Sequence, residues 1–254
     1  MSDGLNLCGV EKIMISLFII IFIITLLAFA FTVPLNGYLT EKLIMHGAYD
    51  KQYVHERMVA DWLEYFDILG TFSLFFLGFG WGTILSVEPV YITGVHKTLR
   101  TILAYSAQAL ASIAIAVCAI MISVLLTGKG CILTAFDMFF VNSRYVGTDA
   151  TWQIFQRGSA YFSSCSPYAI TATLFFIGIV YVQTGILFLS MMRNTIQALL
   201  YPFRSRLIAL NYSWLFMIAI PLIFCILFYK FFFVLAISFI IFFINSISSL
   251  LHGV

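Results

Sequence analysis

Residues 66 to 82 read FDILGTFSLFFLGFGWG. A carboxylate, Asp67, leads directly into an apolar run, and the run ends in three glycines and a tryptophan. Each glycine costs a helix about 1 kcal/mol relative to alanine, so Gly78, Gly80 and Gly82 predict a break or a turn. We therefore expect a helix over 67–86 that either crosses a membrane or re-enters it.

The composition around this segment is that of a membrane protein. Hydrophobic residues make up 62% of the chain and charged residues 9%, with a mean hydropathy of +1.04, which leaves too little polar surface for a soluble domain. One crossing takes about 20 residues, so 254 residues predict a single all-α domain, 1–254: a multi-pass transmembrane bundle of about six helices. A bacterial inner membrane and an organelle membrane fit equally well.

The partners expected from composition are the lipid bilayer and other membrane proteins. The net charge is +2, and no basic cluster is denser than Arg204-x-Arg206, which argues against nucleic acid. The sequence predicts no cofactor.

Apolar runs predict the remaining helices, at about 13–33, 101–126, 168–192, 212–229 and 231–251. The first run ends at Pro34 and is followed by the turn-forming pair Asn36-Gly37. A signal peptide is the alternative for this run, although it is longer than a typical signal sequence. The third run is closed by Gly128-Lys129-Gly130.

Two further patterns predict helix surfaces. Residues 54–66 carry apolar side chains at helical spacing, including Trp62, and predict an amphipathic helix on the membrane surface. A row of small residues in the third helix predicts close approach of another helix; it comprises Ala104, Ala107, Ala111 and Ala114.

Few polar residues lie inside the apolar runs. Gln108 and Gln183 do, and we expect them to form hydrogen bonds between helices. The alternative is a small transporter or channel component, in which Gln108, Gln183 and Asp67 would line a water-filled cavity.

The segment 66–82 resembles a known signature. Asp67-x-x-Gly70-Thr71, followed by Gly78-Phe79-Gly80-Trp81, is similar to the pattern of the site-2 protease family of intramembrane zinc metalloproteases. These enzymes carry His-Glu-x-x-His on an early helix, where two imidazoles on one face hold zinc and the Glu activates water. The resemblance implies that family's helical membrane fold.

The catalytic blocks of that family are missing from this chain. Aligning Gly37-Tyr38 with the Gly-aromatic pair that often follows the family's motif places Thr32, Val33 and Asn36 at the first His, the Glu and the second His. No Asp or Glu follows Asp149, so the family's third zinc ligand, an Asp, is also missing. The resemblance thus implies a degenerate member: a pseudoprotease without catalytic or metal-binding residues, working as a scaffold, complex subunit or partner-binding module.

The candidate interaction or packing residues are therefore Asp67, Gly70, Gly78, Gly80, Trp81, Gln108 and Trp62. Cys131 and Cys165 lie near the two ends of the polar segment 127–166 and would form a disulfide if it faces an oxidising compartment. The segment from Arg193 to Arg206 contains basic residues and no acids, which favours a cytoplasmic position for this loop. With six full crossings the N-terminus would lie on that same side, and a re-entrant 67–86 would change this.

Overall fold

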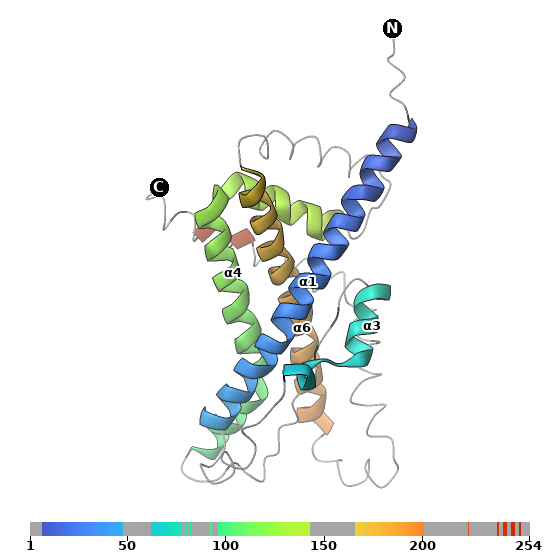
Figure 1. Ribbon diagram of the computed structural model, residues 1–254. Helices are drawn as coiled ribbons and strands as arrows, with labels where there is room; N and C mark the ends of the chain where they lie inside the picture. The colour runs from blue at the N-terminus through green and yellow to red at the C-terminus, as the bar shows by residue number, and fades with distance from the viewer. Residues whose placement is uncertain are drawn as a thin grey trace. The chain divides into compact units, whose positions relative to one another are not determined.

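A computed structural model describes residues 7–47, 62–77, 96–142 and 166–200, the single positions 80, 82 and 92, and seven positions between 223 and 249. The elements in chain order are α1 (Leu7–Gly47), the short 3-10 helix η1 (Trp62–Tyr65), α3 (Ile68–Leu77), α4 (Lys97–Asn142) and α6 (Pro167–Leu200) (Figure 1). This part of the chain is all-helical apart from one isolated β-bridge, as the apolar runs predicted. Residues 54–61 of the expected amphipathic segment lie outside the described residues. So do 212–229 and 231–251, apart from those seven positions, which are all helical.

The helix α1 is longer than the predicted 13–33, because it continues through Pro34 to Gly47. The expectation of a turn at 34–37 was wrong. Proline is tolerated inside a membrane helix when neighbouring helices bond the backbone groups around it. The carbonyl oxygen of Thr32, two residues before Pro34, accepts a hydrogen bond from Gln183 Nε2 at 3.3 Å, so α6 bonds to the α1 backbone near the proline.

The segment 66–82 does not form the continuous helix expected over 67–86. Its helix α3 has only 10 residues, and neither Gly80 nor Gly82 is helical. Gly82 instead pairs with Phe66 in an isolated antiparallel bridge. The two ends of the segment 66–82 therefore lie next to each other. The break at the glycines is the one that their helix propensity predicted.

The helices α4 and α6 contain the predicted helices 101–126 and 168–192 and extend beyond both. Gly128-Lys129-Gly130 was expected to end the first of them, yet α4 continues to Asn142, and its ribbon changes direction beyond the membrane-length stretch (Figure 1). Glycines in a helix permit such a bend without ending it. The start of α6 is well specified, because Ser166 Oγ accepts a hydrogen bond from the Ala169 amide and Pro167 occupies the first helical position.

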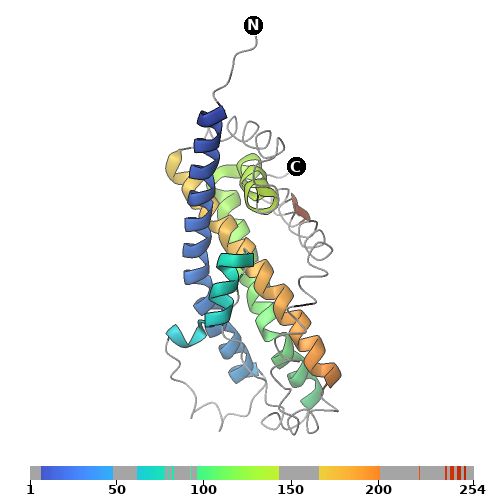
Figure 2. The same ribbon diagram turned by 90° about the vertical axis from the view of Figure 1, so that its right-hand side faces the viewer.

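The chain divides into two compact units, and α1, α4 and α6 each contribute one segment to both. Unit 1 comprises Met1–Phe31, Val117–Val182 and Phe243–Val254, and unit 2 comprises Thr32–Ala116 and Gln183–Phe242. In unit 1, Phe29, Ile132 and Ile177 are buried, and the hydroxyls of Thr127 and Thr173 lie 2.9 Å apart. In unit 2, segments of α1, α4 and α6 lie side by side, with α4 antiparallel to the other two (Figures 1 and 2).

In the part of the chain that the structure describes, three helices are long and apolar enough to cross a membrane: Ile19–Gly47 of α1, Lys97–Thr127 of α4 and Pro167–Asn194 of α6. Their surfaces carry exposed apolar side chains, among them Ile23 and Leu27 on α1 and Leu125 on α4. Such faces are stable against lipid and costly in water. The composition and these helices together indicate a membrane protein whose described part is helical apart from the isolated bridge.

Candidate functional site

A buried polar network joins the three long helices inside unit 2. Asn36 of α1 donates from Nδ2 to Ser112 Oγ of α4 at 2.8 Å and to Gln183 Oε1 of α6 at 2.9 Å. Thr40, one turn further along α1, donates to Asn36 Oδ1 at 3.4 Å, and Gln183 Nε2 donates to the Thr32 carbonyl. One amide, Asn36, thus connects all three helices.

The network is almost completely removed from solvent. The exposed fraction is 0% for Thr32 and Gln183, 1% for Asn36 and Ser112, and 2% for Thr40. Ser112 lies midway along the Lys97–Thr127 span, and Gln183 lies near the middle of Pro167–Asn194. The polar groups therefore sit at mid-depth in these spans, where an unpaired amide costs several kcal/mol and paired amides hold helices together.

The small residues of α4 pack next to this network. Ala104, Ala107 and Ala111 are buried, as predicted for a face that another helix approaches, whereas Ala114 is exposed. Asn194 of α6 donates from its side-chain amide to the Tyr105 carbonyl of α4, one residue along from Ala104. The alanine face thus allows the backbones of α4 and α6 to come close in unit 2.

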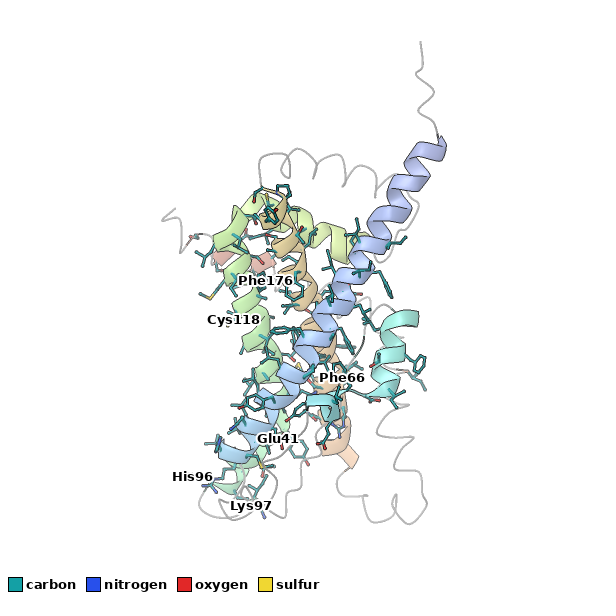
Figure 3. All side chains as sticks on the ribbon, in the orientation of Figure 1. Glu41, Phe66, His96, Lys97, Cys118 and Phe176 are labelled. Carbon is teal, nitrogen blue, oxygen red and sulfur yellow. The ribbon has the colours of Figure 1, made fainter. Side chains whose placement is uncertain are left out.

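A second polar contact fixes the segment before α3 against α1. Tyr65 of η1 is 4% exposed, and its hydroxyl donates to Glu41 Oε2. Its ring lies over Gly37, where a Cβ would come within 2.6 Å of Tyr65 Cγ. Gly82 also lies close to Tyr65, because a Cβ on Gly82 would lie 2.6 Å from the Tyr65 carbonyl oxygen. Figure 3 labels Glu41 on α1 and Phe66 just before α3.

The environment of Tyr65 changes its acidity. Burial raises the pKa of the Tyr65 hydroxyl well above its ordinary value of 10.0, and the hydrogen bond and negative charge of Glu41 raise it further. The hydroxyl is therefore a stable donor to Glu41 throughout the physiological pH range.

The predicted site residues of the 66–82 segment have mainly structural surroundings. Asp67 directly precedes α3, and its carbonyl accepts hydrogen bonds from the amide and the hydroxyl of Thr71, each at 2.8 Å. Gly70 and Gly80 are buried, and Trp62 begins η1. Gly78 and Trp81 lie outside the described residues.

The predicted polar residues of the long helices are not gathered at one point. Gln183 belongs to the network, whereas Gln108, one turn from Ser112 on α4, is half-buried and takes no part in the network's hydrogen bonds. Cys131 is buried on α4, and Cys165 lies outside the described residues, so the expected disulfide stays a prediction.

The network offers no zinc-binding chemistry. Zinc in proteins is held by thiolates, imidazoles and carboxylates, whereas this network consists of amides, hydroxyls and one backbone carbonyl that bond one another. Among the described residues, no three His, Cys, Asp or Glu side chains lie close enough to hold a metal ion. The residues of this network therefore do not fit the zinc ion that the family resemblance implies.

Sequence reasoning identified part of this site and missed the rest. Gln183 stood out as a polar residue in an apolar run, and Thr32 and Asn36 entered only through the alignment with the family motif. Ser112, Tyr65 and the role of Gly37 were missed. The sequence of α1 does show Asn36 and Thr40 four residues apart with Gly37 between them. The partners of Asn36, Ser112 and Gln183, lie 76 and 147 residues away in the sequence.

The chain has no match among models of protein families, among curated proteins or among solved structures.

Proposed function

We propose that this chain is a non-catalytic integral membrane protein of site-2-protease-like fold that acts by binding: a scaffold, a subunit of a larger membrane complex or a partner-recognition module. The main observation in its support is the network around Asn36. The positions aligned with the family's two zinc-binding histidines, Thr32 and Asn36, lie on one buried face of α1 and bond to Gln183 of α6. At the positions where the family has zinc ligands, this chain therefore has polar groups that bond one helix to another.

The same observation argues against the transporter alternative. A water-filled path needs polar side chains that point into an open space. Gln183 instead uses its carbonyl oxygen on Asn36 and its amide on Thr32. Such a residue holds helices together and has little capacity left to coordinate a moving solute.

We further propose that residues 66–82 form a re-entrant hairpin and that the whole bundle has about six helical segments, with 212–229 and 231–251 as the last two. The 10-residue helix α3 is about 15 Å long, roughly half the hydrocarbon thickness of a bilayer. The bridge between Phe66 and Gly82 brings both ends of the segment together, which supports entry and exit on one side.

Metal analysis and native co-purification test the binding function. We expect protein purified from native membranes without chelators to carry no stoichiometric zinc and to bring with it the same membrane partners in repeated preparations. The matched variant is Asn36→Ala, which should weaken the bundle and its recovery while leaving metal content unchanged. One zinc per chain would overturn the proposal, and so would a chain that is always recovered alone.

A further inference from the structure

We infer that the end of unit 2 formed by the last turn of α1 and the first turn of α4 faces the cytoplasm. The N-terminus and the segment between α4 and α6 then lie on the opposite side of the membrane. This orientation rests on the proposal that 66–82 is re-entrant.

The first step is that α1 ends and α4 begins on the same side. Gly47, the last residue of α1, lies against the side chain of Leu103, seven residues into α4: a Cβ on Gly47 would come within 2.5 Å of Leu103 Cδ2. The bridge between Phe66 and Gly82 closes the α3 segment on itself. Residues 48–96 therefore make no net crossing of the membrane.

The second step follows the three spans in order. The span of α1 runs from the N-terminal side to the side of Gly47, α4 runs back, and α6 returns to the side of Gly47. The loop after α6, including Arg204 and Arg206, then begins on the side opposite the N-terminus. Six full crossings would have placed the N-terminus and this loop on the same side. With a re-entrant 66–82 they lie on opposite sides.

The third step is the distribution of basic residues. Lys and Arg near the ends of spans are enriched on the cytoplasmic side, where anionic headgroups attract them. The side of Gly47 carries eight such residues: Lys42, Lys51, Arg57, Lys97, Arg100, Arg193, Arg204 and Arg206. The opposite side carries five: Lys12, Lys129, Arg144, Arg157 and, beyond the proposed crossing at 212–229, Lys230. This excess of eight over five favours the side of Gly47 as the cytoplasmic one.

Local contacts support the same assignment. Lys42 lies over the ring of Tyr38, with its ammonium nitrogen 5.4 Å from the ring centre, an arrangement that suits an aromatic residue and a cation at a membrane interface. His96 and Lys97 are exposed at the beginning of α4 (Figure 3). The acids of this end, Glu41 among them, do not alter the inference, because orientation follows Lys and Arg and only weakly the net charge.

Cysteine labelling of the full chain in intact cells tests this orientation. Three single-cysteine variants, His46→Cys, Lys97→Cys and Ser166→Cys, are made in a background without the five native cysteines and treated with a membrane-impermeant maleimide. All three positions are exposed. We expect Ser166→Cys to react in intact cells, and His46→Cys and Lys97→Cys to react only after permeabilisation. Reaction in permeabilised cells serves as the control for each site.

Two other outcomes are distinguishable from each other. If His46→Cys and Lys97→Cys react in intact cells and Ser166→Cys does not, the orientation is overturned while the re-entrant segment survives. If His46→Cys and Lys97→Cys lie on opposite sides, residues 48–96 cross the membrane, and the re-entrant proposal and the orientation both fail.

Discussion

At the scale of single residues, Asn36 connects three helices, because it bonds to Ser112, Gln183 and Thr40 inside unit 2. Hydrogen bonds between membrane helices contribute about 0.6 kcal/mol on average and at most about 1.7 kcal/mol. Asn36→Ala removes two interhelical bonds and leaves buried partners unpaired, so we expect a loss of about 1–3 kcal/mol in unfolding free energy. Reversible unfolding by SDS in mixed micelles measures it.

A double-mutant cycle isolates the bond between Asn36 and Gln183. Asn36→Ala and Gln183→Ala should be non-additive by about 0.6–1.7 kcal/mol. The control is Thr25→Val in unit 1, whose hydroxyl bonds to the Ile21 carbonyl within α1. Its effect should add to that of Asn36→Ala. Strict additivity for Asn36 and Gln183 would contradict the network.

Two glycines of α1 give a matched pair for the packing of Tyr65. A methyl group at Gly37 would overlap the buried Tyr65 ring, whereas one at Gly47 meets only the flexible end of Leu103. Overpacking typically costs about 1–3 kcal/mol, so Gly37→Ala should lower the thermal stability in detergent, and Gly47→Ala should change it little. Equal effects of the two substitutions would show that Tyr65 does not rest on Gly37.

The raised pKa of Tyr65 predicts an alkaline effect on stability. Above the ordinary value of 10.0 the unfolded chain loses the Tyr65 proton while the folded chain retains it, so this residue contributes stability below pH 10 that declines as the pH rises further. Tyr65→Phe removes this contribution. Thermal unfolding of both proteins between pH 8 and about 11 should show a steeper alkaline decline for the wild type, and parallel declines would count against the buried contact with Glu41.

At the scale of elements, α4 and α6 are in contact in unit 1 through Thr127 and Thr173. Their hydroxyl oxygens are 2.9 Å apart, so cysteines at both positions can reach the S–S distance of about 2.0 Å with small shifts. In a background without native cysteines, Thr127→Cys with Thr173→Cys should oxidise to a disulfide, seen as a gel shift that reductant reverses. Thr127→Cys with Thr171→Cys is the control, because Thr171 is exposed and bonds to the Pro167 carbonyl. Equal cross-linking of both pairs would contradict this packing.

The elements also show how far sequence alone reaches. Long apolar runs predicted α1, α4 and α6, because crossing a bilayer demands such runs whatever surrounds them. The helix ends were predicted poorly. Pro34 and Gly37 have the local character of a turn, yet Gln183 bonds beside the proline and Tyr65 fills the space over the glycine. Contacts between residues far apart in the sequence overrode a local preference of a few kcal/mol, and no local pattern contains them.

The candidate site divides in the same way. The sequence predicted that Gln183 would form hydrogen bonds to another helix, because an unpaired amide in an apolar run is costly. Which residues it would meet depended on the rotation of α1 and α4 about their axes, and the sequence of either helix leaves that open. The short α3 was foreseeable from its glycines, but its return to Phe66 required the position of Gly82 against Val33 and Tyr65.

At the scale of the whole molecule, residence in the bilayer rests on the outer faces of the long helices. On α1, a stripe at every fourth residue is about half exposed and consists of Ile19, Ile23, Leu27 and Phe31, with 49–56% of each side chain accessible. No polar residue interrupts this stripe, so water would meet a continuous apolar surface. Lipid is the environment that stabilises it.

A charge placed in this stripe should impair insertion. Lys costs a membrane helix about 2.5–3.5 kcal/mol at its centre and less toward its ends, where the side chain can reach the interface, so Ile23→Lys should reduce the alkali-resistant membrane fraction of the expressed protein. Ile23→Leu, which keeps the apolar surface, serves as the matched control and should insert like the wild type. If Ile23→Lys inserts as well as Ile23→Leu, then α1 presents this face to protein or water, and the faces that the bundle turns to lipid must be sought on α4 and α6.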